Sequence, residues 1–518
     1  MAHPDPSRFP RAIRRFLAGD TGHTLLVHGE PGTGKTLFAL RCLDVLSTEN
    51  EVLYVSSRVN KATIAEMYLD DRLSIDETAI VDLSEDPFAL PITPAVPFDK
   101  LTLDSLLEWI ESVHDASAGL TIAFDSWGLI HQYPASRHDV APDRSTVTSR
   151  LAALARQTGV TVLLVSEGQS PAPLRYIVDG VVAPQVTEDD RGRACRDLQM
   201  QKLRGIHIEN RRQPFTLVGG RFQALPQAEV QSLSASPDAE TWQMRPNSKR
   251  SFSTGLTDLD PVLRGGYDRG TVVHLELGVD LPRDAWSVLT LPTIRNFLAN
   301  EMCATVVPPR EASPGLVKND VTAVVADNRV QTHGQIIRTA TGDGRVGRSD
   351  SMVSTGDEPP QRRDRPPQSV SATSTPPDRS DAGPAGYGDQ TDTDSHAGVR
   401  SPQKLAYDEY IGYAERLRDR HEGPQLHVIG LDNVQQEFKR QLGAFANYAA
   451  LHNDLVVLIT KPGETLRDRT DRVADTHLQL ERAGTGLIMY GENPLTPRLG
   501  IEIDSTPAIP QLTLLEMV

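Results

Sequence analysis

The 518-residue chain has few cysteines, few lysines and no long apolar run. Cys42, Cys195 and Cys303 are too few and too scattered for a disulfide framework or a cysteine-based metal site. No run approaches the roughly 18 apolar residues of a membrane span. Residues 1–10 lack the apolar segment of a secretory signal. We therefore expect a cytoplasmic protein that does not act at a membrane.

Lysine is replaced almost throughout by arginine, in a chain whose formal net charge is −16. Only nine of its 53 basic residues are lysine. Such a composition resembles that of haloarchaeal proteins, whose acidic surfaces stay hydrated in brine; an acidic protein from a milder environment is the alternative. The charge disfavours direct DNA binding, because no contiguous lysine-rich stripe is present and high salt weakens phosphate contacts steeply.

What the sequence does contain is one complete phosphate-binding loop, Gly29-Glu30-Pro31-Gly32-Thr33-Gly34-Lys35-Thr36. A β-prone run at 23–28 precedes this G-x-x-x-x-G-K-[ST] motif and a helical pattern at 37–46 follows it. Backbone N–H groups and the helix N-terminus would hold phosphate oxygens. Lys35 would reach the β- and γ-phosphates and Thr36 would ligate Mg²⁺. The sequence therefore predicts binding of ATP with Mg²⁺, and a chance glycine-rich turn is the alternative.

An aspartate that follows another strand belongs to the same predicted site. Residues 119–126 form an apolar strand that ends in Asp125. An aspartate at the carboxyl end of a neighbouring strand holds Mg²⁺ in phosphate-loop NTPases, so Asp125 is a candidate metal and catalytic residue; a helix cap is the alternative. Apolar strands at 51–57, 159–166 and 176–182 alternate with helices, which predicts a doubly wound parallel α/β sheet. A hairpin from 199–218 would close it.

These elements, in this order, resemble the RecA-superfamily, KaiC-like ATPases. The resemblance rests on the phosphate loop, the strand ending Asp-Ser, the Ile-Val-Asp-Gly-Val-Val run and a Lys-x-Arg-Gly hairpin. Residues 9–17, 22–29 and 54–59 further resemble the archaeal gas-vesicle regulators of the GvpD family. The GvpD resemblance covers residues 9 to 222 and implies repression of gas-vesicle formation through a partner transcription activator.

The resemblance also marks a departure from the KaiC-like pattern. In KaiC-like enzymes an acidic pair after the second strand activates the attacking water, but here Ser56-Ser57-Arg58 stands at that place. Efficient attack needs a base or an orienting group. We therefore expect slow ATP hydrolysis, unless another acid such as Glu66 reaches the site, and a nucleotide-dependent switch in place of a motor.

Two sets of basic residues are candidates for contacts with other chains. Lys202 and Arg204 match the Lys-x-Arg pair that reaches a neighbour's γ-phosphate in hexameric relatives, which implies a homo-oligomer; solvated hairpin cations are the alternative. The resemblance to GvpD-like proteins, which carry arginine-rich regulatory regions, makes a second group a candidate. Its members are Arg191, Arg193, Arg196, Arg211 and Arg212, and charge balance against nearby acids is the alternative.

The second half of the chain repeats the first in a degenerate form. Residues 253–276 resemble the opening of a KaiC-like domain, but Arg283, Asp284 and Ala285 replace the second glycine, the lysine and the threonine of a phosphate loop. An aspartate there repels phosphate, so we expect no ATP binding of the usual kind. The later repeat elements are predicted at 304–310, 405–420, 426–433, 434–451, 455–460 and 486–498.

The predicted organisation is two tandem RecA-like domains. Residues 1–224 form the domain with the phosphate loop, 225–252 a linker, and 253–325 plus 403–518 the degenerate domain. Residues 326–402 are a polar insertion too poor in apolar residues to fold, which we expect to be disordered. The leading functional prediction is a regulatory ATP-binding protein that acts through a protein partner. The alternatives are a RecA/RadA-like DNA-acting ATPase, a generic KaiC-like signalling ATPase, and a structural interaction protein with a vestigial site.

Overall fold

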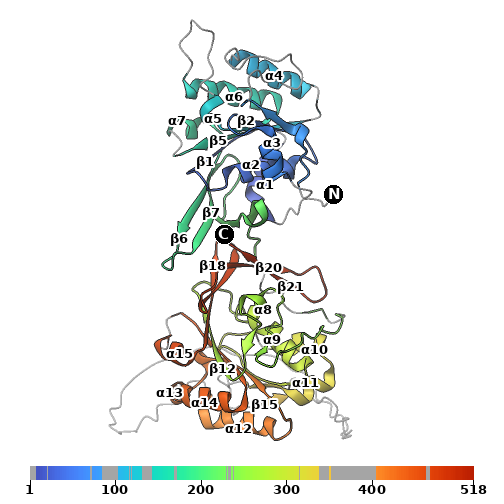
Figure 1. Cartoon of the computed structure of the whole chain (residues 1–518), viewed down its shortest axis with the longest axis vertical. Coiled ribbons are helices and arrows are strands. Elements are labelled where there is room, and N and C mark those ends of the chain that lie inside the picture. The colour runs from blue at the N-terminus through green and yellow to red at the C-terminus, as the bar shows by residue number, and fades with distance from the viewer. Residues whose placement is uncertain are drawn as a thin grey trace, which may run out of the picture.

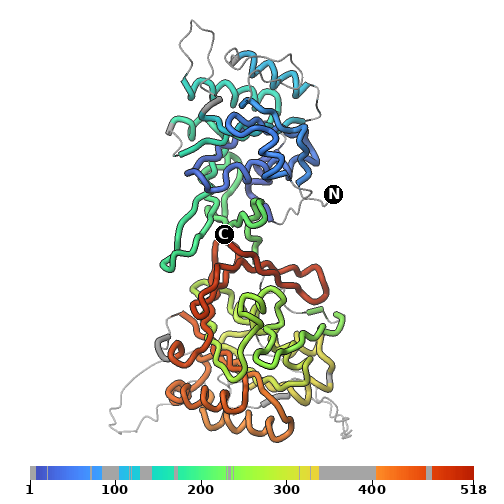
Figure 2. Tube along the Cα trace, in the orientation of Figure 1, coloured from blue at the N-terminus to red at the C-terminus, as the bar shows by residue number. Residues whose placement is uncertain are grey.

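The computed structural model shows two α/β domains stacked along the long axis of the molecule (Figures 1 and 2). The strands β18 to β21 lie on the side of the second domain that faces the first domain, and the C-terminal end of the chain lies at the junction (Figure 1). The structure describes residues 8–517 apart from 20, 70–72, 85–102, 116, 118, 131–142, 169–171, 229, 231–234, 237–238, 314, 338–348, 352–403 and 463–466.

The first domain contains a nine-stranded sheet of order β3-β2-β4-β5-β1-β6-β7-β8-β9. In this order, each neighbouring pair from β3 through β2, β4, β5 and β1 to β6 is parallel. The pairs from β6 through β7 and β8 to β9 are antiparallel. Their bounds are β1 Thr24–Gly29, β2 Glu51–Ser56, β3 Ile80–Asp82, β4 Leu120–Asp125, β5 Thr161–Glu167, β6 Gly180–Glu188, β7 Ala194–Leu203, β8 Arg212–Thr216 and β9 Gln223–Ala224.

Helices cover both faces of this sheet. Side chains of α1, α2 and α3 join the core on one face, and those of α4, α6 and α7 join the core on the other. The helices are α1 Arg11–Leu17, α2 Lys35–Leu46, α3 Lys61–Tyr68, α4 Leu103–Asp115, α5 Trp127–Ile130, α6 Arg144–Thr158 and α7 Ala172–Ile177. Because the parallel strands are buried on both faces, they read as continuous apolar runs in the sequence.

The second domain contains a ten-stranded sheet of order β15-β14-β13-β16-β17-β12-β18-β19-β20-β21. Its bounds are β12 Thr271–Leu277, β13 Cys303–Val307, β14 Gly334–Ile337, β15 Ser349–Ser351, β16 Gln425–Gly430, β17 Leu455–Thr460, β18 Thr476–Ala483, β19 Gly486–Asn493, β20 Leu499–Asp504 and β21 Gln511–Glu516. A small ribbon pairs β10 Ser251–Phe252 with β11 Tyr267–Asp268. The helices are α8 Leu259–Val262, α9 Ser287–Ala299, α10 Leu316–Val324, α11 Asp327–His333, α12 Tyr407–Arg418, α13 Gln436–Arg440, α14 Leu442–His452 and α15 Arg467–Val473.

The two sheets share one topology. The order β2-β4-β5-β1-β6-β7 in the first matches β13-β16-β17-β12-β18-β19 in the second, with the same switch from parallel to antiparallel pairing. The predicted pair of tandem RecA-like α/β domains is therefore confirmed. Among the described residues, no helix has both the length and the apolar character needed to cross a membrane.

Both domains fasten the amino edge of the sheet with an aspartate. Asp179 accepts from the backbone N–H of Thr24 at 3.2 Å, and its own N–H donates to the Thr24 carbonyl at 3.0 Å. Asp475 makes the same two bonds with Val272, at 2.9 and 2.8 Å. This amino-edge latch aligns β1 with β12 and β6 with β18, so that Thr24 corresponds to Val272 and Asp179 to Asp475.

Several predicted boundaries are wrong. Residues 176–182 are not one strand, because Leu174 and Val178 both face the core at helical spacing; α7 ends at Ile177 and β6 begins at Gly180. The helix predicted at 434–451 is divided into α13 and α14.

The predicted disordered insertion begins too early. Its first residues form α11 and β14, because Val330 and Ile337 supply buried apolar anchors within the polar sequence. Residues 338–348 and 352–403 lie outside the described part of the chain. The predicted linker packs on the second domain, where the backbone N–H of Trp242 donates to the Val324 carbonyl at 2.7 Å.

Candidate nucleotide-binding site

The phosphate loop lies between β1 and α2, at the carboxyl edge of the first sheet. Gly32 and Gly34 have φ values of 77° and 95°, a left-handed conformation that favours glycine. A Cβ atom on Gly29 would lie 2.8 Å from the Pro184 carbonyl oxygen of β6. The motif glycines are thus required by the path of the loop and by its close approach to the neighbouring strand.

The Lys35 side chain folds back over this loop. Its Nζ donates to the carbonyl oxygens of Gly29 at 2.9 Å and Glu30 at 2.7 Å. Burial lowers the pKa of Lys35, while the carboxylates of Glu167, Asp125 and Glu30 act in the opposite direction. The ammonium group therefore lies where phosphate oxygens bound by the loop would replace its carbonyl partners.

The two predicted Mg²⁺ ligands are brought together. The Thr36 hydroxyl donates to Asp125 Oδ2 at 2.7 Å, and the Tyr54 hydroxyl donates to the same oxygen at 2.6 Å. Burial raises the pKa of Tyr54, so its hydroxyl remains a proton donor. A hydroxyl beside a carboxylate offers the oxygen ligands that Mg²⁺ prefers, and these residues fit that ion.

Sequence reasoning missed Glu167, which ends β5 directly opposite Gly29 in the register of the sheet. Its carboxylate pairs with the Arg58 guanidinium, and the hydrogen bond from Arg58 holds the pKa of Glu167 below its usual range. Glu66, the acid named from the sequence, is exposed on α3. The available signal was an acid at the carboxyl end of a strand neighbouring β1, one residue beyond the predicted strand.

Lys202 and Arg204 lie at the opposite edge of the sheet. Lys202 Nζ donates to two carbonyl oxygens at the carboxyl end of α7. They belong to Arg175 in the last turn of the helix, at 3.0 Å, and to Val178 directly after it, at 2.6 Å. Arg204 Nη1 donates to Asp179 Oδ1 at 2.7 Å, beside the amino-edge latch. A six-residue strand such as β1 spans about 20 Å, so within one chain this pair does not join the phosphate loop. Its action on a neighbouring chain stays a prediction.

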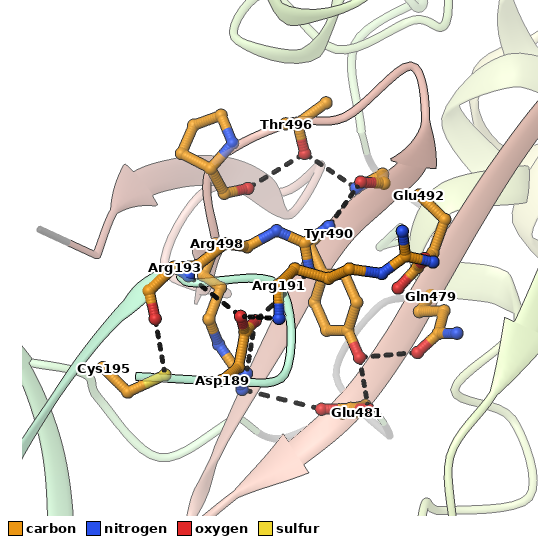
Figure 3. Close-up of polar contacts among 12 residues, drawn as sticks. Asp189, Arg191, Arg193, Cys195, Gln479, Glu481, Tyr490, Glu492, Thr496 and Arg498 are labelled. Atoms are coloured by element: carbon orange, nitrogen blue, oxygen red, sulfur yellow. Dashed lines mark hydrogen bonds and ion pairs between the residues drawn. The ribbon is translucent and has the colours of Figure 1, made fainter. Parts of the chain in front are cut away.

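The five arginines of the basic group all lie in the first domain, and two of them contact the second domain. β6 and β7 form a long hairpin whose turn reaches the second domain, as Figure 3 shows. There Arg193 Nη2 donates to the Gly491 carbonyl at 2.9 Å, and its guanidinium carbon lies 4.5 Å from the centre of the Tyr490 ring. Arg191 pairs with the Glu492 carboxylate.

The remaining members of the group lie nearer the phosphate loop and β8. Arg196 Nη1 donates to the Gly32 carbonyl at 3.2 Å, so the hairpin contacts the phosphate loop as well as the second domain. Arg212 begins β8, and Arg211 precedes it. Charge balance within the hairpin is also present, since Arg193 pairs with Asp189 at 3.3 Å.

The second domain fills the corresponding edge with its own contacts. Asp284, which takes the position of the motif lysine when the loop is counted from Gly278, accepts from the backbone N–H of Ser313 at 2.8 Å. Ala285 is fully buried. Lys461 pairs with Asp432 at 3.2 Å, at the carboxyl edge where Asp125 lies in the first domain. That this domain does not bind ATP in the usual way stays a prediction.

A RecA-like sheet with a complete phosphate loop and a strand-end aspartate defines a phosphate-loop NTPase related to KaiC. In agreement, the chain is 26% identical to the circadian clock oscillator protein KaiC of Acaryochloris marina, over 49% of this chain and 47% of that protein. Residues 13–201 match the family model described as GvpD gas vesicle protein, P-loop domain, and residues 241–518 match GvpD basic region 2. The chain belongs to the GvpD family.

Two full-length relatives support this assignment. The chain is 50% identical to protein GvpD1 of Halobacterium salinarum, over 100% of this chain and 99% of that protein. It is also 50% identical to protein GvpD2 of the same organism, over 100% of this chain and 98% of that protein.

Proposed function

We propose that the protein is an ATP-dependent regulator of gas-vesicle formation, with nucleotide and Mg²⁺ bound at the first domain. One observation carries the proposal. Thr36 and Asp125 share a 2.7 Å hydrogen bond beside a loop whose lysine contacts the carbonyls of Gly29 and Glu30. When bound, Mg²⁺ would neutralise phosphate charge; the loop and Lys35 would bind and orient the phosphates.

We infer that hydrolysis is slow. The last residue of β2 and the two that follow it are Ser56, Ser57 and Arg58, none of which is a carboxylate. Glu167 is near, but the ion pair with Arg58 lowers its pKa and so makes it a weak base. This arrangement favours a protein whose bound nucleotide sets its conformation over one that turns nucleotide over rapidly.

We propose that the regulator acts through a protein partner, consistent with repression through a transcription activator. Its net charge of −16 disfavours direct contact with DNA. The second domain supports the protein-partner role, because it retains the fold while its phosphate-loop positions carry Asp284 and Ala285.

Nucleotide titration of the purified full chain tests the proposal. Lys35→Ala should weaken Mg²⁺–ATP binding by about 10- to 150-fold, corresponding to loss of charged hydrogen bonds of roughly 1.5–3 kcal/mol. Lys461→Ala is the matched control, since this lysine lies at the carboxyl edge of the second sheet and should leave binding unchanged. Equal affinity in wild type and Lys35→Ala would refute the proposal.

A further inference from the structure

A polar cluster of two buried histidines and one exposed aspartate lies in the second domain, on the face of β12 that packs against α14 and α15. His274 of β12 and His477 of β18 are register partners, and their rings stack with centroids 4.4 Å apart. Asp471 of α15 reaches both rings: its Oδ1 lies 2.9 Å from His274 Nδ1 and 3.4 Å from His477 Nδ1. One ligand atom from each of the three residues lies within 4.8 Å of the other two.

We propose that His274, His477 and Asp471 form a binding site for a divalent transition-metal ion, with Zn²⁺ the expected occupant. Imidazole nitrogen and carboxylate oxygen are ordinary zinc ligands, bound at about 2.0–2.2 Å. A tetrahedral arrangement places such ligand atoms about 3.3 Å apart. The two nitrogen–oxygen separations in the cluster are close to that spacing.

The outer contacts of both rings support the assignment. His477 Nε2 lies 3.0 Å from Glu276 Oε2, and His274 Nε2 lies 2.7 Å from the Thr460 hydroxyl. Metal-bound histidines characteristically use the second ring nitrogen for such a bond, which fixes the ring and directs the other nitrogen at the ion. Each Nδ1 is thereby directed toward Asp471.

The number of protons that His477 can donate also favours a bound metal ion. His477 faces a carboxylate from each ring nitrogen, Glu276 on one side and Asp471 on the other. A neutral imidazole has one N–H, so its second nitrogen would direct a lone pair at a carboxylate oxygen. A metal ion between Nδ1 and Asp471 removes that repulsion.

The first domain shows that the fold does not require polar groups here. With the amino-edge latches superposed, His274 corresponds to Leu26 and His477 to Val181, which are themselves register partners. Both of these apolar residues are buried in the core of the first domain. The second domain has therefore replaced an apolar pair by two histidines at one register position, against the desolvation cost of buried polar groups.

Bound zinc would connect the short helix α15 to two adjacent strands. Asp471 belongs to the seven-residue helix Arg467–Val473, whereas His274 and His477 are fixed in the sheet. The ion would thus serve as a structural cross-link within the second domain, away from the nucleotide site of the first.

Zinc titration of the EDTA-treated full chain, in competition with a chromophoric chelator, tests the site. We expect one zinc ion per chain and a higher melting temperature with zinc than with EDTA. The variant His274→Leu/His477→Val introduces the residues of the first domain at the same positions. It should fold, bind zinc at least on the order of 100-fold more weakly and lose the zinc-dependent rise in melting temperature.

Two further variants distinguish a metal site from a hydrogen-bonded histidine cluster. Glu276→Gln should weaken zinc binding by roughly 10- to 100-fold, as expected for a residue that orients a ligand. His421→Gln alters a second pair of histidine rings, in which His421 lies tilted against His333 with centroids 4.0 Å apart, and it should leave zinc binding unchanged. The proposal is overturned if the wild-type protein binds no zinc. That result is expected if His477 is instead protonated between the two carboxylates. Equal zinc binding by wild type and the double variant also overturns it.

Discussion

Arg193 is expected to hold the two domains together more strongly than its neighbour Arg191. The Arg193 side chain is 8% exposed, donates to the Gly491 carbonyl and lies over the Tyr490 ring. A hydrogen bond from a charged donor contributes about 1.5–3 kcal/mol. A cation–π contact contributes about 0.5–2 kcal/mol, depending on desolvation. We therefore expect Arg193→Ala to destabilise the domain junction by about 2–4 kcal/mol.

Arg191→Ala is the matched control, two residues away in the same turn. The Arg191 side chain is 59% exposed, and an exposed ion pair such as Arg191–Glu492 is worth about 0.2–1 kcal/mol. Calorimetry should show Arg193→Ala lowering the melting transition of the less stable domain by about 5–15 °C, since about 1 kcal/mol corresponds to 2–4 °C in a domain of this size. Arg191→Ala should shift it by only a few degrees, and by less in high salt. Equal shifts for both variants, or none for Arg193→Ala, would refute the reasoning.

Three further predictions concern the first domain. Arg58→Ala should increase ATP turnover in a phosphate-release assay, because it raises the pKa of Glu167, whereas Glu167→Gln should lower turnover; no change in either variant would rule Glu167 out as the base. Asp125→Asn should abolish the gain in nucleotide affinity that Mg²⁺ gives, measured by calorimetric titration with Mg²⁺ or EDTA, and an unchanged gain would remove Asp125 from the metal site. Lys202→Ala combined with Arg204→Ala should abolish ATP-dependent self-association in sedimentation velocity, and a wild-type monomer under all conditions would reject their role across a subunit boundary.

The sheet and the phosphate loop could be predicted from the sequence because their signals are local. Parallel strands buried on both faces appear as continuous apolar runs, and the loop requires glycines at fixed spacing. The same patterns located Asp125 correctly at the end of β4, where it meets Thr36. The repeat was also visible, since its strands keep their order after the phosphate chemistry is lost.

The contacts that depend on tertiary pairing could not be read in this way. Residues 185–197 contain mostly polar residues, so neither the length of the β6–β7 hairpin nor its contact with the second domain had an apolar signal. The Arg58–Glu167 ion pair joins residues 109 positions apart, one two residues after β2 and the other at the end of β5, and these two strands are not neighbours in the sheet. Likewise, the alignment of His274 with His477 follows from the strand register alone.

The amino-edge latches stabilise each sheet at the edge opposite to the one where nucleotide chemistry would take place. Asp179 and Asp475 fasten the ends of the sheets opposite to the phosphate-loop positions, and both copies keep them. A copy that exchanges its phosphate-loop lysine and threonine for Asp284 and Ala285 consequently loses none of the bonds that fasten its strands. Duplication of such a sheet leaves one copy free to evolve at its carboxyl edge while its scaffold is inherited intact.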